Sequence, residues 1–372
     1  MINRRKGAGE MGKKAEARLR SVRQADDARP ETDEWWSARA DADLQPLDRW
    51  LRSLGLIAAL LPALAVVFIA VVLFASALPS ILFNGLNFFT HNQWSFGNFY
   101  GNATVVRNGI QAPVGAAYGA FPIIVGTLLT SIIAFIVGVP ISVGAALILA
   151  ERIPPRIGRG LSFFLELLAG IPSVVYGLWG LIVLGPFLAS EIYPQMARLG
   201  GVIPWLGPPT GSGLGLLTAG LVLAVMIIPI VASTTRDLLR QVPTLPREGA
   251  LALGLTPWET AWVVSIPWTV QGIVGAAMLG WGRALGETMA VLIVSGNGAN
   301  LLPPNVYSPI STIAASIVAL LDSAESDPTG LAVSALAEAG LVLMLITLLT
   351  NVLARLLVRR ASSVNLPVGR GI

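Results

Sequence analysis

Residues 54–78 form a run of 25 residues without a charged side chain. About 20 apolar residues are enough to cross a bilayer as an α-helix, so this run predicts a transmembrane helix. Ala75-Ser76-Ala77 resembles a signal-peptidase site, but the run is longer than the core of a signal peptide and follows a polar segment of about fifty residues. We therefore expect an uncleaved membrane anchor.

Further apolar segments recur along the chain, which is 54% hydrophobic and only 12% charged, the composition of a polytopic membrane protein. A shorter apolar segment, 309–321, cannot cross a bilayer and is expected to be interfacial or re-entrant. The sequence thus predicts an all-α polytopic protein with six transmembrane helices. After the first, the expected spans are 121–150, 161–188, 214–235, 268–296 and 334–358.

The distribution of basic residues predicts the orientation of these spans. With six spans both termini lie on one side, and that side together with its loops carries 22 of the 25 Lys and Arg residues. The opposite loops hold only Arg107 and Arg198, and Arg283 lies within a span. The positive-inside rule therefore predicts cytoplasmic termini. The net charge of +4 is then a topology signal, and no nucleic acid partner is expected.

The chain is expected to divide into five segments. Leu44, Leu47 and Leu51 recur at helical spacing, which favours an amphipathic helix in the inner membrane interface, although a frayed start of the first span is the alternative. The expected segments are a polar, disordered cytoplasmic tail (1–43), the interfacial helix (44–53), the first transmembrane helix with an external loop (54–120), a core of five transmembrane helices containing the loop 236–267 (121–358), and a C-terminal cytoplasmic tail (359–372).

The loop after the fourth predicted span carries the most specific spacing in the chain. It reads Glu248-Gly249-Ala250, three residues, Gly254, nine residues and Val264-Ser265-Ile266-Pro267. This resembles the E-A-A-x3-G-x9-I-x-L-P loop of permease subunits of bacterial ABC importers. It departs at Gly249, where that family usually has alanine, and in the aliphatic residues before Pro267.

From the residues alone, 250–253 form a short helix with small side chains that Gly254 ends, and Pro257 and Pro267 bracket a second helix over 258–265. An ordinary connecting loop is the alternative. The resemblance implies a coupling helix that enters a cleft on the ATPase subunit and a proline that breaks the chain before the next span. The residues assigned to coupling are Arg247, Glu248, Gly249, Ala250, Leu251, Gly254 and Pro267.

Several chemistries are excluded by what the full sequence lacks. The chain has no G-x-x-x-x-G-K-[ST] motif, so ATP hydrolysis would require a separate chain. It has no cysteine and a single histidine, His91, which excludes thiolate and histidine-cluster metal sites. We expect a transport subunit that is not itself an enzyme and carries no cofactor. An ion-driven secondary transporter would explain the spans but not the coupling loop.

A charge pair lies within the fifth predicted span. On a continuous helix Arg283 and Glu287 are one turn apart, close enough for a salt bridge. Charged side chains in a membrane are costly unless they are paired or hydrated. The helix face that carries Arg283 and Glu287 should therefore point into the bundle or line a pathway. Either the pair neutralises itself and fixes the helix against a neighbour, or Arg283 attracts an anionic substrate with Glu287 holding it in place.

Two motifs resemble the PstC-type permease family of the phosphate ABC importer: RALGETMAV (283–291) and GIPSVVYGLWG (170–180). Sulfate and molybdate permeases share the Arg, Leu, Gly and Glu core but resemble it less at Thr288 and Met289, and they remain alternatives. The resemblance implies a type I importer permease of MetI-like architecture in the bacterial inner membrane. It also implies a PstA-type partner, a PstB-type ATPase dimer, and a phosphate-binding protein that delivers phosphate to the outer face.

Residues of the third predicted span complete the expected pathway. Pro172 should kink the helix and free carbonyls that protein or water must then pair, and Ser173 follows it. Pathway lining and a packing kink are both open, and Glu166 is equally a candidate for a helix-to-helix hydrogen bond or a gate. The external segments 79–120 and 189–213 are expected to receive the binding protein, the alternative being solvated loops without a partner.

Overall fold

The computed structural model describes residues 32–98, 103–209 and 211–361. The chain divides after Ile69 into two units, and α2 (Thr32–Asn84) runs from the first into the second. Residues 44–53, expected as a separate interfacial helix, form part of this continuous helix, as do residues 32–43 of the expected tail. Residues 1–31 of that tail, and residues 362–372, lie outside the described residues.

Six helices of the described residues are long and apolar enough to cross a membrane. The predicted number of spans and the all-α class are therefore confirmed. The short α14 (Ile313–Glu325), close to the apolar segment predicted at 309–321, is not one of the six. The six are Trp50–Asn84 within α2, Phe121–Glu151 (α4), Ser173–Gly201, Leu216–Arg240 (α9), Pro257–Leu285, and Leu331–Leu356 within α15 (Leu331–Ala361).

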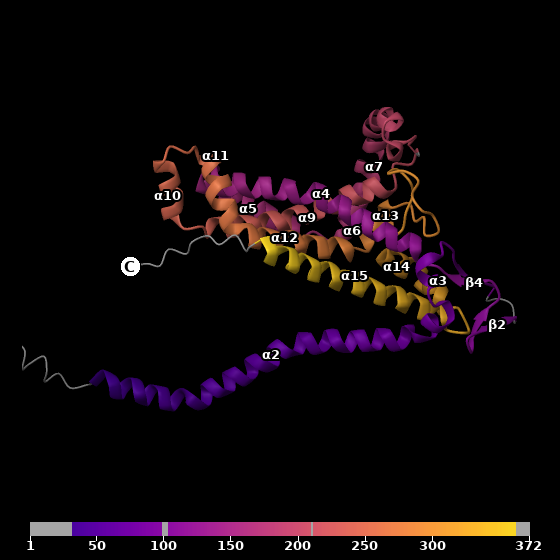
Figure 1. The fold of residues 1–372 in the computed structure, drawn as a ribbon, viewed down its shortest axis with the longest axis horizontal. Helices are drawn as coiled ribbons and strands as arrows, with labels where there is room; N and C mark the ends of the chain where they lie inside the picture. Colours follow the sequence, from indigo (N-terminus) through magenta and orange to yellow (C-terminus); the bar gives the residue numbers. More distant parts are fainter. Residues whose placement is uncertain (1–31, 99–102, 210, 362–372) are drawn as a thin grey trace, which may run out of the picture. The chain divides into compact units, whose positions relative to one another are not determined.

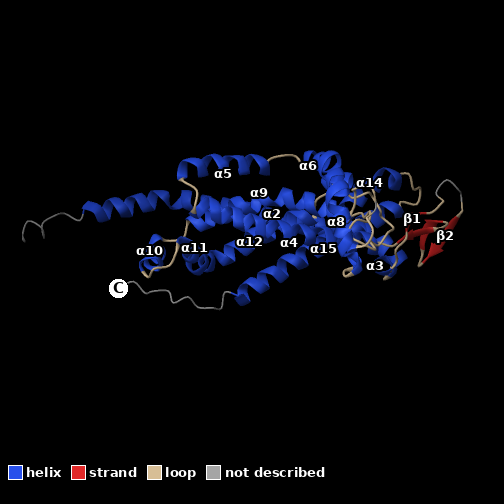
Figure 2. Cartoon of the chain, turned by 90° about the horizontal axis from the view of Figure 1, so that it is seen from above, coloured by secondary structure: helices blue, strands red, loops and turns tan. Residues whose placement is uncertain are grey.

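The third predicted span, 161–188, is wrong as a continuous helix, because the chain leaves helical geometry at residues 170–172. The amphipathic α5 (Pro155–Ala169) ends there and α6 (Ser173–Trp179) begins on the other side of Pro172. Figures 1 and 2 show α5 running along α9, and the region of α7 turning away from the bundle. After α6 the helix continues through η1 (Gly180–Leu184), α7 (Gly185–Phe187), η2 (Leu188–Ile192), α8 (Tyr193–Ala197) and η3 (Arg198–Gly201), and η4 (Pro204–Leu206) follows.

The helix break predicted at Pro267 does not occur. A continuous helical run passes from α11 (Pro257–Thr260) through the π-helical η5 (Ala261–Ser265) into α12 (Ile266–Leu285). Pro267 stands in the first turn of α12, where a missing N–H is tolerated because the wider π turn shifts the hydrogen bonding and Ile266 N donates to Ala261 O. The chain breaks later, between Leu285 and α13 (Met289–Val294).

The centre of the bundle is formed by α4, α9 and α12, which pack on one another through small residues. A Cβ atom on Gly138 of α4 would lie 2.8 Å from Ile227 Cγ1 of α9, and one on Gly280 of α12 would lie 2.6 Å from Val231 Cγ2. Such separations are below van der Waals contact, so these positions require glycine for the helices to approach. Close approach at small residues is the usual source of packing energy between membrane helices.

One end of the second unit carries strands and the opposite end carries α10 (Thr244–Ala252) (Figure 2). These two small antiparallel sheets were not predicted, although Asn108-Gly109 is a hairpin signal in the sequence: both residues have positive φ, 53° and 82°, as a two-residue type I′ turn requires. The elements at this end are α3 (Asn87–Thr90), β1 (Trp94–Phe96) paired with β4 (Ala116–Tyr118), and β2 (Thr104–Arg107) paired with β3 (Ile110–Pro113).

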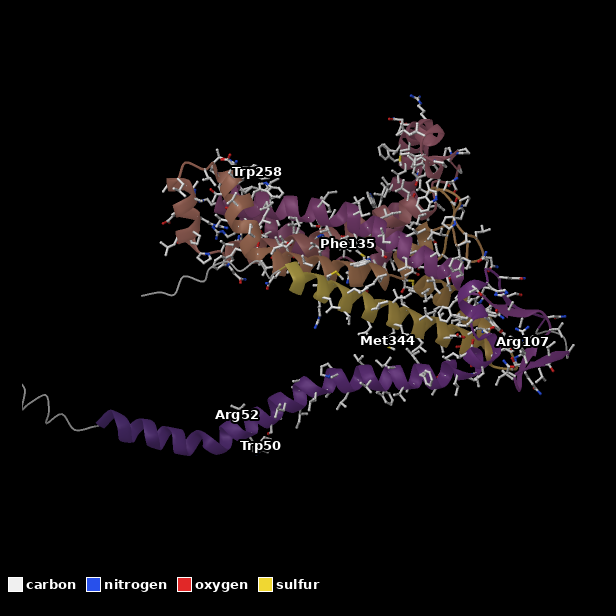
Figure 3. The ribbon with its side chains drawn as sticks, viewed as in Figure 1. Trp50, Arg52, Arg107, Phe135, Trp258 and Met344 are labelled. Atoms are coloured by element: carbon white, nitrogen blue, oxygen red, sulfur yellow. The ribbon has the colours of Figure 1, made fainter. Side chains whose placement is uncertain are left out.

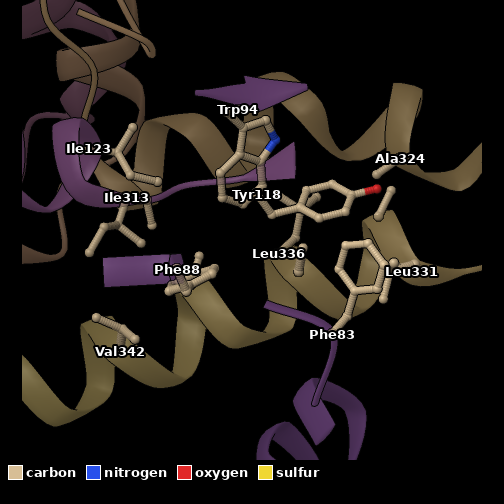
Figure 4. Close-up of a cluster of buried hydrophobic side chains, with 14 of the residues drawn as sticks. Phe83, Phe88, Trp94, Tyr118, Ile123, Ile313, Ala324, Leu331, Leu336 and Val342 are labelled. Carbon is tan, nitrogen blue, oxygen red and sulfur yellow. The ribbon is translucent and has the colours of Figure 1, made fainter. Parts of the chain in front are cut away.

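A hydrophobic cluster joins these strands to the helices (Figure 4). Trp94 of β1 and Tyr118 of β4 stack edge to face, with ring centroids 5.6 Å apart. Ile313 of α14 and Leu336 of α15 are buried in the same cluster. The short helix α14 is thus held inside the protein, where its backbone is covered without crossing the bilayer.

Candidate substrate pathway and coupling loop

The two motifs singled out in the sequence lie against each other. Gly177 of α6 faces the backbone of α13, and a Cβ atom there would lie 3.0 Å from the Cα of Ala290. One turn on, a Cβ atom on Gly180 would lie 2.8 Å from Val294 Cγ1. The glycines of GIPSVVYGLWG therefore allow this helix to meet the segment that carries RALGETMAV.

Arg283 and Glu287 do not form the predicted salt bridge. Arg283 is in the last turn of α12, which ends at Leu285, and residues 286–288 are not helical. Because the chain turns at Gly286, the two side chains are not one helical turn apart, and no ion pair joins them among the described residues. The prediction failed because it assumed an unbroken helix.

Glu287 instead supports the start of α13. Its side chain is 9% exposed, and its Oε1 accepts a hydrogen bond of 3.4 Å from Ala290 N. A negative charge at this position also favours the positive end of a helix dipole. The neighbouring Thr288 donates from Oγ1 to Gly286 O at 3.3 Å, closing the turn between the helices. Both residues therefore shape the break rather than pair with Arg283.

The side chain of Arg283 remains available to bind a ligand. Its side chain is exposed, and within the described ranges no hydrogen bond or ion pair engages it. It acts electrostatically on the phenol of Tyr176 on α6. The exposed guanidinium thus stands at a helix break beside the other motif.

The second helix break provides its own hydrogen-bond partners, as the sequence predicted. The Tyr176 hydroxyl donates to Leu168 O at 2.8 Å, and Gly170 N donates to Leu167 O at 3.0 Å. Two carbonyls released at the end of α5 are therefore paired within the protein. Pro172 caps α6 and Ser173 is its first residue, so both predicted residues lie at the break.

Glu166 makes a contact between helices and lies outside the motif pair. Its Oε1 is 3.2 Å from Nη2 of Arg236 on α9. Arg236 is only 4% exposed and is also paired with the adjacent Asp237 at 2.7 Å. Of the two roles considered, this geometry favours the helix-to-helix interaction, which ties α5 to α9.

The coupling loop folds as a short capped helix. α10 ends with Gly254 in the left-handed region, at φ 89°. Gly254 N donates to Leu251 O and Leu255 N donates to Ala250 O, the two bonds of a Schellman motif. The following α11 begins with a capping box between Thr256 and Glu259. The predicted glycine stop is confirmed.

Arg247 anchors the base of α10 to the bundle. Its Nη2 lies 2.6 Å from Glu151 Oε1 at the end of α4 and donates to Leu239 O at 2.8 Å. Glu151 Oε1 also accepts a hydrogen bond of 2.9 Å from Ser265 Oγ. One carboxylate therefore connects α4, α10 and η5.

The remaining coupling residues divide into buried and exposed faces. Ala250 is buried against the bundle, whereas Glu248, Gly249 and Leu251 are exposed. Leu253, at the tip, is 83% exposed. An exposed leucine on a short rigid helix offers a docking surface, because burying it on a partner is favourable.

Comparison with known proteins identifies the family. Residues 138–363, more than half of the chain, match the family described as binding-protein-dependent transport system inner membrane component. The chain is 56% identical to the "Phosphate transport system permease protein PstC 1" of Mycobacterium tuberculosis over 331 residues, which is 88% of this chain and 96% of the relative. The chain belongs to the PstC permease family.

Other relatives agree. The permease is 41% identical to a PstC protein of Pasteurella multocida, over 77% of this chain and 87% of the relative. A bacterial alginate ABC transporter, solved with an alginate pentasaccharide-bound periplasmic protein, has a chain of similar fold at a TM-score of 0.52 and 16% identity. That match covers 87% of this permease and 98% of the other chain. It supports the type I fold alone.

Some residues of the permease that build the site were missed in the sequence. Tyr176 and Gly177 lie inside the motif GIPSVVYGLWG, but their partners became visible only when α6 was placed against α13 and α5. Glu151 had no local signal, because its partner Arg247 is 96 residues away. Arg247, assigned to ATPase coupling, bonds to Glu151 and to Leu239 O, so its side chain supports the base of α10.

Proposed function

We propose that this chain is the permease subunit of an ATP-driven phosphate importer. The observation that carries the proposal is its 56% identity to a phosphate transport permease over 88% of the chain. The helical bundle, the capped coupling helix and the lack of a P-loop motif support it. The chain is a component of the bacterial inner membrane and works as a transport subunit.

Phosphate passes Arg283 in the proposed mechanism. Three features support this residue: its guanidinium is exposed, it is unpaired among the described residues, and it lies at a helix break. A guanidinium matches the oxygens of a tetrahedral oxyanion through two parallel hydrogen bonds. The nearby Glu287 keeps the binding weak enough for release, because its negative charge repels the anion.

Coupling runs through α10. ATP binding by two PstB-type subunits closes them, moves α10 through its exposed tip, and reorients the helices joined by the Arg247–Glu151 pair. A PstA-type permease completes the pathway, and a phosphate-binding protein delivers the substrate on the outer face. In this arrangement both termini and α10 are cytoplasmic, as the basic residues predict.

The test is radiolabelled phosphate uptake into vesicles containing this chain, a PstA-type partner, the ATPase and the binding protein. We expect ATP-dependent uptake that excess sulfate and molybdate do not reduce. Competition by sulfate or molybdate would assign that anion as the substrate in place of phosphate, but would keep the assignment as an ABC importer permease. Uptake without the ATPase would overturn the importer assignment in favour of a secondary transporter.

A further inference from the structure

A polar cavity of about 180 Å³ opens at the strand-bearing end of the second unit. The polar side chains in its lining come from the end of α2, from α3 and the turn after it, and from β2. They are Asn84, Asn87, His91, Gln93 and Arg107. Among the described residues no aspartate or glutamate lines it, and Arg107 supplies a permanent positive charge.

Arg107 is held in position before any ligand arrives. It is the last residue of β2 and pairs across the type I′ turn with Ile110. The turn is tied to α2, because Asn108 Nδ2 donates to Leu82 O at 2.8 Å. The Arg107 guanidinium carbon lies 5.2 Å from the centre of the Phe83 ring, a cation–π contact. Figure 3 shows Arg107 at the end of this unit opposite Trp258 of α11.

The floor of the cavity is equally fixed. Asn84 is 7% exposed, and its Nδ2 donates to Ser80 Oγ at 2.9 Å. Ser80 Oγ in turn donates to Glu338 Oε2 of α15 at 2.5 Å. This chain of hydrogen bonds joins the end of α2 to α15 beneath the cavity, so the site sits on two helices and not on a loop alone.

Two acidic groups lie close to lining residues, and both already accept hydrogen bonds. Glu338 Oε2 accepts the bond from Ser80 Oγ that continues from Asn84. Asp327, which acts electrostatically on the lining residue Tyr118, accepts from Thr329 N at 2.9 Å and Ala332 N at 3.0 Å, at the start of α15. Neither carboxylate is among the described residues that line the cavity.

We propose that this cavity receives an acidic side chain of the protein that delivers the substrate. A carboxylate fits the guanidinium of Arg107 through paired hydrogen bonds. The apolar residues beside the cavity favour a protein over a free anion. Leu86 precedes the lining residue Asn87 and is 81% exposed, and Val106 precedes Arg107 and is 60% exposed. A protein partner would bury these apolar side chains around the ion pair, whereas an ion would leave them in water. The inference rests on the proposed function, in which such a protein docks on the outer face.

The experiment measures binding of the substrate-loaded binding protein to the complete importer in nanodiscs, with Arg107→Glu compared with Arg156→Glu. Both variants make the same charge change at an exposed arginine, but Arg156 lies at the start of α5, at the end of the second unit that carries α10. We expect Arg107→Glu to weaken docking at least about tenfold and to reduce its salt dependence, while Arg156→Glu stays within about twofold. Substituting lysine for the matching acidic residue of the binding protein should restore docking to Arg107→Glu.

Equal docking by the two variants would overturn the inference. Unchanged docking combined with weaker binding of free inorganic phosphate to Arg107→Glu would also overturn it, because the occupant would then be the ion. If Arg107→Glu fails to assemble with its partners, Arg107→Gln is measured in the same assay with the same two criteria. Phosphate uptake by the unaltered importer tests the proposed function separately, so the two failures are distinguishable.

Discussion

At the residue scale, two buried tyrosines show how a hydroxyl can stabilise or destabilise the same fold. The Tyr176 hydroxyl pairs a carbonyl released at the end of α5. The Tyr118 hydroxyl is buried at 2% exposure, with no hydrogen-bond partner among the described residues. Phenylalanine at either position removes one oxygen, but only at position 176 does it remove a hydrogen bond, and Leu168 O then keeps its bond of 3.2 Å from Ile171 N.

We therefore expect opposite effects on stability. Tyr176→Phe should lower the free energy of unfolding by about 1 kcal/mol, the net contribution of one hydrogen bond, whereas Tyr118→Phe should leave it unchanged or raise it. Thermal unfolding of the two variants in one detergent measures both. A lower unfolding temperature for Tyr118→Phe would show that its hydroxyl has a partner.

Tyr118 also predicts a response to alkaline pH. Burial first, and the charge of Asp327 second, raise the pKa of the Tyr118 phenol in the fold. The unfolded chain releases this proton near the ordinary tyrosine pKa of about 10, while the folded chain retains it. Stability should therefore fall as the pH rises above about 10, and the fall should be smaller in Tyr118→Phe.

Arg283 carries the prediction about transport. Arg283→Gln removes the charge and the paired donors, so phosphate uptake should fall by about 10- to 100-fold, the worth of hydrogen bonds to a charged group. Assembly should remain intact, because no described side chain pairs with Arg283. Arg283→Lys should give an intermediate rate of phosphate uptake, since lysine keeps the positive charge but lacks the paired N–H donors of the guanidinium. Loss of assembly in Arg283→Gln would indicate a structural role instead.

At the scale of elements, the coupling helix contains a matched pair of glycines. Gly249 and Gly254 both have open space where a Cβ would stand, but only Gly254 has a positive φ. Gly249→Ala should stabilise α10 by about 1 kcal/mol through helix propensity. Gly254→Ala should destabilise it by about 1–2 kcal/mol, because the left-handed conformation strains an alanine.

Hydrogen exchange of the α10 amides distinguishes the two glycine variants. Exchange should be about fivefold slower in Gly249→Ala and at least about fivefold faster in Gly254→Ala. The ATPase should stay attached in Gly249→Ala, since the added methyl group enters open space and leaves the turn at Gly254 intact. Equal exchange in both variants would mean that the turn at Gly254 relaxes without strain.

At the scale of the whole molecule, orientation in the membrane can be tested cleanly because the chain has no natural cysteine. Single cysteines can replace Leu253, at the end of α10, and Val106, in β2. These two elements lie at opposite ends of the second unit (Figure 1), and both positions are exposed. In intact cells a membrane-impermeant maleimide should label Val106→Cys and spare Leu253→Cys. Labelling of Leu253→Cys alone would reverse the proposed orientation.

The sequence by itself determined the number of spans, the glycine stop at Gly254 and the family. The short helix that it predicted over 250–253 begins earlier, at Thr244. The three features that it determined are properties of local composition and spacing, which lipid enforces strongly: long uncharged runs must be helical, and glycine is the residue that most readily takes the left-handed conformation at the end of a helix. The same logic predicted that carbonyls near Pro172 would need partners, although it could not name Tyr176.

Only the tertiary structure decided where helices break and which charges meet. The span of Arg283 ends at Leu285 and the helix at Pro267 continues, because packing of α13 on α6 and the π turn of η5 outweigh local proline and periodicity signals. The true partner of Arg247 is Glu151, and that of Glu166 is Arg236. Such pairs join residues far apart in the chain, and their energies depend on distances that only the folded bundle sets.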